Sequence, residues 1–174
     1  INPNTPTTYT VSPNSMTLNS GGKLLVYAST FTGNYSTNPT VNSGSTVEYA
    51  STLINQTVSS SLTYATLIIS GTTVKSLAAN LPALRSTASS QGNIFVKGGT
   101  FDLLTYTANR GTSTTGGNFN IDNGATVKIG GTNGFPSNYS NKAFQLSSTV
   151  HYYGTNQTVL ADTYGNIIFS SSSG

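Results

Sequence analysis

The sequence contains no cysteine, no tryptophan, a single histidine and few charged residues, and these shortages exclude several classes of protein. Without cysteine there can be neither a disulfide framework nor a thiolate metal site. The single histidine excludes a multi-histidine zinc site within one chain. Charged residues make up 6% of the 174 positions, against about a quarter in average globular proteins. We therefore expect a surface of hydroxyl and amide groups, and no cofactor.

Long apolar runs and basic clusters are also missing. No stretch approaches the ~20 apolar residues that cross a membrane, and the seven Lys and Arg residues are scattered along the chain. Nucleic-acid-binding proteins gather such charges on one face. We expect neither membrane insertion nor nucleic-acid binding. Ten Tyr and seven Phe indicate a folded chain, because disordered polar chains have few aromatic residues.

Short β-rich runs recur along the whole chain, and pairs of Gly, Asn and Ser separate them. Regularly spaced short strands with turn signals between them predict an all-β fold. The runs are Lys23–Tyr27, Thr46–Tyr49, Thr66–Ile69, Asn93–Lys97, Thr100–Thr107, Thr126–Ile129, Thr149–Tyr153 and Asn166–Phe169.

Two segments match each other, residues 16–71 and about 119–174. Ser45–Tyr49 (STVEY) matches Ser148–Tyr152 (STVHY), and Asn55–Val58 (NQTV) matches Asn156–Val159. Matched positions lie about 100 residues apart. This repeat length is longer than one solenoid coil, so each repeat would hold several coils. Residues 72–117 would complete the first repeat. Residues 1–15 fit the pattern poorly and would be an extension, a cap or a donated strand.

These features predict a right-handed parallel β-helix (a β-solenoid) over residues 16–174, with roughly seven or eight coils. Stacked coils place equivalent side chains in ladders, where Asn, Thr and aromatic residues are favoured and like charges repel. A tandem β-sandwich is the alternative, but the second copy has few residues for one. In a solenoid we expect matched residues to face inward together, for example Val47 with Val150 and Val58 with Val159. With few charges, we expect little dependence of stability on mild changes of pH.

Some strings resemble segments of large repeat-rich surface proteins of Bacteroidetes-type bacteria, which are autotransporter-like or type-IX-secreted adhesins. They are Gly99–Arg110 (GTFDLLTYTANR), Lys128–Pro136 (KIGGTNGFP) and the paired Ser-Thr-Val-x-Tyr and Asn-Gln-Thr-Val motifs. The resemblance runs from about residue 16 onward and is poor at residues 79–92. It implies a bacterial β-helical protein, secreted or at the cell surface, with an adhesive or scaffolding role and no catalytic residues to transfer.

Acidic and histidine side chains give little support for an enzyme. β-helical polysaccharide lyases gather acids and a basic residue, and the candidates here are Asp122, Asp162, Arg110 and Lys128. We interpret the two aspartates as turn residues instead. The repeat matches His151 with Glu48, so His151 is expected to be an outward strand residue. A polysaccharide-cleaving enzyme therefore remains the least favoured hypothesis, and we expect no catalytic and no metal-binding residues.

Six tyrosines recur in pairs and could form a platform for stacking sugars. They are Tyr35, Tyr49 and Tyr64 in the first copy, matched by Tyr139, Tyr152 and Tyr164 in the second. The favoured interpretation is that their rings pack in the core with the hydroxyls at the surface. A polysaccharide-binding surface module is the alternative function.

A solenoid has two open ends whose unpaired backbone groups invite another chain unless a cap covers them. The sequence favours an extracellular structural protein that builds an adhesive stalk or a head-to-tail filament. Its partners would be other copies or neighbouring modules of a longer chain, with surface polysaccharide as an alternative. The candidate assembly residues are Ile1, Tyr9, Val11, Ile168 and Phe169.

Overall fold

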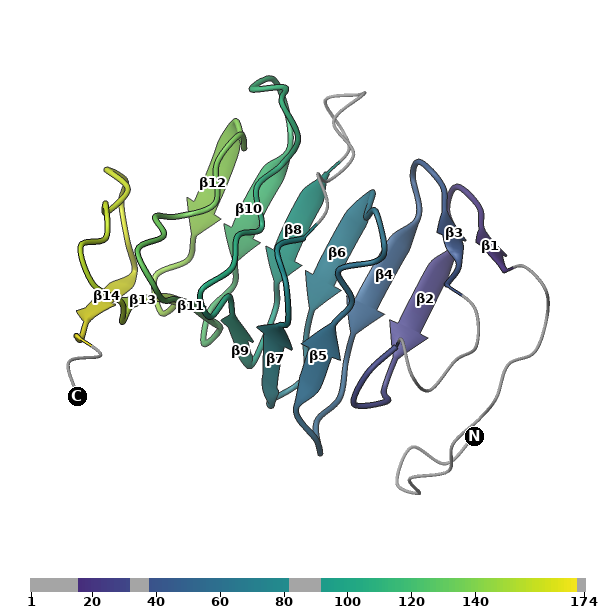
Figure 1. The fold of residues 1–174 in the computed structure, drawn as a ribbon, viewed down its shortest axis with the longest axis horizontal. Coiled ribbons are helices and arrows are strands. Elements are labelled where there is room, and N and C mark those ends of the chain that lie inside the picture. The colour runs from purple at the N-terminus through teal and green to yellow at the C-terminus, as the bar shows by residue number, and fades with distance from the viewer. Residues whose placement is uncertain (1–15, 32–37, 82–91, 172–174) are drawn as a thin grey trace.

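The computed structural model describes residues 16–31, 38–81 and 92–171, and within them the chain is all β with no helix. Parallel strands stack along one axis as a β-solenoid, so the predicted fold class is confirmed (Figure 1). Ile1, Tyr9 and Val11, together with the whole segment 1–15, lie outside the described residues.

Three parallel sheets form the faces of the solenoid. The first sheet pairs β1 (Thr17–Leu18) with β3 (Thr40–Val41). The second sheet contains β2 (Lys23–Val26), β4 (Thr46–Tyr49), β6 (Thr66–Ile69), β8 (Asn93–Val96), β10 (Asn118–Ile121) and β12 (Asn141–Phe144). The third contains β5 (Gln56–Val58), β7 (Val74–Leu77), β9 (Thr100–Asp102), β11 (Thr126–Ile129), β13 (Thr149–Tyr152) and β14 (Asn166–Phe169).

The number of coils is smaller than the sequence predicts. Each six-stranded sheet gives five turns between its first and last strands, and the expectation of seven or eight coils is wrong. Coil length also varies: Asn93 pairs with Thr66, 27 residues earlier, whereas Asn166 pairs with Thr149, 17 residues earlier. A fixed coil length does not apply because the corner loops differ in size.

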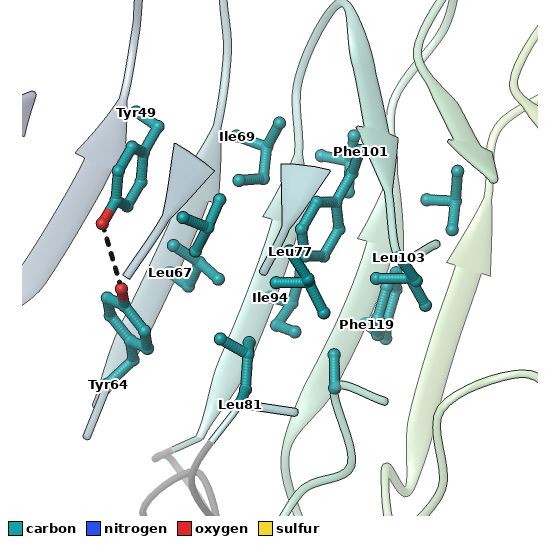
Figure 2. Close-up of a cluster of buried hydrophobic side chains, with 14 of the residues drawn as sticks. Tyr49, Tyr64, Leu67, Ile69, Leu77, Leu81, Ile94, Phe101, Leu103 and Phe119 are labelled. Carbon is teal, nitrogen blue, oxygen red and sulfur yellow. Dashed lines mark hydrogen bonds between the residues drawn. The ribbon is translucent and has the colours of Figure 1, made fainter. Parts of the chain in front are cut away.

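Most strands begin with a Thr or Asn, and several then alternate between inward and outward residues. In β4 and β13 the second and fourth residues are buried and the first and third are partly exposed. The inward side chains form one continuous apolar core along the axis, part of which Figure 2 shows between Tyr49 and Phe119. Because side chains alternate between the two faces of a strand, inward side chains stack on inward side chains of the next coil, and outward side chains stack on outward ones.

Asparagine side chains form a ladder along the start of the second sheet. Asn118 Nδ2 donates to Asn93 Oδ1 at 2.9 Å, and Asn141 Nδ2 donates to Asn118 Oδ1 at 3.2 Å. Each amide donates to one neighbour and accepts from the other, which is why Asn can stack on itself where a charged residue would repel.

The two sequence copies occupy neighbouring faces of the solenoid. The matched strand pairs are β1 with β10, β2 with β11, β3 with β12, β4 with β13, and β6 with β14. The β1–β3 pair belongs to the first sheet but β10–β12 to the second, and β2–β4–β6 belongs to the second sheet but β11–β13–β14 to the third. The second copy is therefore advanced by one face around the axis.

Matched residues share an environment except at the C-terminal end. Val47 and Val150 are both fully buried, as expected. Val58 is fully buried as well, but its mate Val159 is 40% exposed, so the expectation that both face the core is wrong for this pair. The reason lies in the next coil: β7 covers Val58 through its pairing with Leu77, whereas no described strand covers Val159.

Candidate functional site

Tyr49 and Tyr64 form a closed hydrogen-bonded group in the core. Their hydroxyl oxygens lie 3.1 Å apart (Figure 2). The Ser59 N–H donates to the Tyr49 hydroxyl at 2.8 Å, and the Tyr64 hydroxyl donates to the Ser59 carbonyl at 2.6 Å. The remaining proton, on Tyr49, therefore points to Tyr64. Both side chains are fully buried, and this burial raises the pKa of each phenol.

The second copy repeats this group at the C-terminal end. The hydroxyl oxygens of Tyr152 and Tyr164 lie 3.4 Å apart, Tyr152 accepts from the Leu160 N–H at 3.3 Å, and Tyr164 donates to the Leu160 carbonyl at 2.6 Å. Tyr152 is buried, while Tyr164 is partly buried and stacks on Phe144. Each tyrosine pair thus fixes the loop that returns the chain to the next strand.

Four of the six tyrosines considered as a sugar-stacking platform are buried. Tyr49, Tyr64, Tyr139 and Tyr152 are in the core, so their ring faces contact protein atoms. Tyr139 packs edge-on against Phe119 and donates to the Ala108 carbonyl at 2.7 Å. The expectation that the hydroxyls reach the surface is wrong for Tyr49, Tyr64 and Tyr139. The Tyr64 and Tyr139 hydroxyls donate to backbone carbonyls inside the fold, and the Tyr49 hydroxyl is bonded to Tyr64. Tyr35 lies outside the described residues.

A glutamine in each copy joins consecutive coils, although the sequence analysis assigned it no role. Gln56 Nε2 donates to the carbonyls of Val26 and Ala28 at 2.9 and 2.8 Å, while its Oε1 accepts from the Ser51 N–H. Gln157 makes the matching contacts with the Ile129 and Asn133 carbonyls and the Gly154 N–H. The recurrence of Gln within Asn-Gln-Thr-Val is the signal that could have revealed this role.

Two cations are buried and donate to backbone carbonyls. Lys75 Nζ donates to the Ser51 carbonyl at 2.8 Å and to Thr73, and its burial lowers its pKa to about 8. Arg110 donates to the carbonyls of Ser113 and Thr115 at 3.0 Å. Both side chains are completely covered. Backbone carbonyls solvate these two charges, and nothing in the sequence distinguishes them from surface residues.

The outer face of the third sheet carries the densest group of polar side chains. Lys128 lies 3.7 Å from an Asp102 carboxylate oxygen and 4.7 Å from the ring centre of Tyr153, whose hydroxyl donates to Asp102 at 2.9 Å. His151 Nε2 contacts Ser170 Oγ at 2.7 Å. Among the described residues no carboxylate bonds to His151, so this pair lacks the acid that orients the base of a hydrolytic triad.

The repeat explains the position of His151. Glu48, its match in β4, accepts a 2.5 Å hydrogen bond from Ser70, the match of Ser170. Burial raises the pKa of Glu48, but hydrogen bonds from Lys23 and Ser70 outweigh it and the pKa is lowered. Both residues are outward, as expected, and each contacts a serine of the next coil.

The remaining candidates for polysaccharide cleavage do not converge. Asp122 is in a turn, where its carbonyl accepts from Ala125, and Asp162 is exposed and accepts from the Thr163 N–H. Arg110 is buried on loop carbonyls. In the part of the chain that the structure describes, no group of three acidic or histidine residues could hold a metal ion.

The C-terminal strand β14 is the most exposed apolar part of the described structure. Ile168 is 46% exposed and Phe169 is 62% exposed, although Phe169 stacks on Tyr152 with ring centres 5.9 Å apart. A hollow of about 280 Å³ opens beside it, lined by Tyr152, Gly154, Gln157, Val159, Phe169, Ser170 and Ser171. The two described residues among the candidate assembly residues are therefore at an open edge.

Comparison with known proteins adds no assignment, because no family model, no curated protein and no solved structure matches this chain. Among the described residues, no helix is long and apolar enough to cross a membrane.

Proposed function

We propose that the protein is an extracellular structural repeat protein that builds an adhesive stalk or a head-to-tail filament. The observation that carries this proposal is strand β14, which among the described residues pairs only with β13 and exposes apolar side chains. A free strand edge of this kind recruits another strand.

Secretion or display at a bacterial cell surface is part of the same proposal. It rests on the resemblance of the repeat strings to surface adhesins and on the scarcity of charged residues. A surface of neutral ladders suits a long rod, since stacked like charges would repel along its axis.

Sedimentation velocity over a wide concentration range, with electron microscopy of the same samples, tests the proposal. We expect species that lengthen with concentration and appear as unbranched rods. A chain that stays monomeric at the highest concentration would contradict the homopolymer. Mass spectrometry of the native material distinguishes an assembly of separate chains from neighbouring modules of one longer chain.

The polysaccharide-binding alternative receives no specific support, since four of the six proposed stacking tyrosines are buried. A glycan array read with the wild-type chain would still reveal binding through another surface.

A further inference from the structure

The edge of β14 that no described strand covers has a defined hydrogen-bonding pattern. The N–H groups of Asn166 and Ser170 donate toward β13, to the carbonyls of Ser148 and Tyr152. Backbone groups of successive strand residues point to alternate sides. Ile167 and Phe169 therefore direct their N–H and C=O groups away from β13, toward the position of a further strand.

At the N-terminal end of the described solenoid, the second sheet ends in β2, a strand of the same length as β14. Strand β2 pairs with β4 on one side, and among the described residues nothing pairs with its other side. The N–H groups of Thr46 and Ala50 bond to the carbonyls of Gly22 and Val26. By the same alternation, Lys23 and Leu25 direct their backbone groups away from β4. Leu25 is 47% exposed on the outer face.

We propose that β2 of a second copy adds to β14 as a parallel strand, with Lys23 opposite Asn166 and Val26 opposite Phe169. This rests on the proposed function and names the contact that would produce it. The register is the one that β4 uses on β2 and β14 uses on β13, in which the first residues of the two strands are partners. Inward Leu24 and Val26 then cover Ile167 and Phe169, and no charge on β14 opposes Lys23.

The second copy in this contact is rotated by one face relative to the first. Its second sheet continues the third sheet of the copy below, which is the same step that the internal repeat makes within the chain. Such a head-to-tail contact does not close on itself and generates a filament. The rotation by one face that relates the two copies within a chain is therefore the rotation that would relate neighbouring chains in the filament.

The outer face supplies the means of testing this register. Leu25 and Ile168 become neighbours on the outer surface, and both are about half exposed in the single chain. Outward residues on adjacent strands of this fold pair when their charges are opposite, as Lys23 does with Glu48 at 2.5 Å. Charges placed at positions 25 and 168 should therefore attract or repel across the junction according to sign.

The experiment compares two double variants that share one substitution. Leu25→Lys with Ile168→Glu places opposite charges at each junction, and Leu25→Lys with Ile168→Lys places like charges there. We expect the variant with opposite charges to assemble at about the same protein concentration as the wild-type chain. The variant with like charges should need about a tenfold higher protein concentration. High salt should reduce this difference, because it screens the charges. Leu104→Lys, at an exposed site shortly after β9, a strand that is paired on both sides, is the matched control and should assemble normally.

Equal assembly of the two double variants would overturn the proposed contact while leaving the filament function standing. Failure of the wild-type chain to assemble at any concentration would instead reject the proposed function and the contact with it. Circular dichroism checks that both variants keep the fold, as we expect because both substituted side chains point outward.

Discussion

At Tyr49 and Tyr64, two phenols and one backbone segment satisfy each other's hydrogen bonds within an apolar core. The group couples a strand of the second sheet to the return loop through Ser59. Its matched group at Tyr152 and Tyr164 has longer contacts and lies at the open end. We therefore expect the two tyrosine pairs to contribute differently to the free energy of unfolding, because the cost of an unpaired polar group depends on its burial.

We predict that Tyr49→Phe lowers the free energy of unfolding by about 2 kcal/mol, because it leaves the buried Ser59 N–H without an acceptor. Tyr152→Phe is the matched control and should cost less than about 1 kcal/mol, since water can reach the Leu160 N–H. Chemical denaturation of both variants measures the difference. Equal losses of unfolding free energy in the two variants would show that burial of the hydrogen-bonded hydroxyl does not set the size of the effect.

Lys75 makes stability depend on pH in the basic range, which modifies the expectation of pH independence. Burial lowers its pKa in the folded state to about 8, while an unfolded chain keeps a value of about 10.4. The unfolded state then binds more protons between these values, so stability rises as pH increases through this window. Deprotonation of tyrosine in the unfolded state opposes the rise above about pH 10.

We predict that the melting temperature of the wild-type chain rises between about pH 7.5 and 9.5. Lys75→Met replaces the lysine with an uncharged, unbranched side chain one heavy atom shorter, so the melting temperature of this variant should vary less over this range. Scanning calorimetry at several pH values gives the comparison. Parallel pH profiles for the two proteins would show that Lys75 is not the titrating group.

At the scale of the strand, alternation and turn residues predicted eight of the fourteen strands that the structure describes. Each of the eight β-rich runs contains a strand of the structure, because apolar residues suit the core and the Thr or Asn that begins all but one of the runs suits a ladder. Six strands, β1, β3, β5, β7, β10 and β12, were missed. The first three hold two or three residues each, which is too few for periodicity to be seen. The other three hold four residues each, of which two are polar, so they do not stand out as β-rich runs.

The Asn ladder gives an element-scale prediction. Asn118→Ala removes the hydrogen bonds to Asn93 and from Asn141 and should lower the free energy of unfolding by about 1–2 kcal/mol. Asn120, on the outer face of the same strand, has no described side-chain hydrogen bond. Asn120→Ala should therefore change the free energy of unfolding by less than about 0.5 kcal/mol. Similar effects of the two substitutions on thermal unfolding would argue against a stabilising ladder.

At the scale of the whole molecule, the fold class could be predicted but its dimensions could not. The matched segments reveal a repeat, yet the sequence does not say how many faces a coil has, so the one-face advance of the second copy is visible only in three dimensions. The burial of Lys75 and Arg110 was equally hidden, because the carbonyls that bind them belong to corner loops of irregular length. Val159 differs from Val58 because of its place at the end of the stack.

The proposed contact fixes the axial length that each subunit adds to a filament. The third sheet has six strands, and the bridge between Thr30 and Thr57 adds one more level below β5. Seven levels at a strand spacing of about 4.8 Å give a rise of about 34 Å per subunit, with a rotation of one face.

Helical reconstruction by electron cryo-microscopy of the assembled protein measures this rise and rotation directly. We predict a single-stranded rod with strands perpendicular to its axis, a rise of about 34 Å per subunit and continuous sheets across each junction. Filaments whose subunits meet side by side, or whose rise lies far from this value, would contradict end-to-end stacking through β14 and β2.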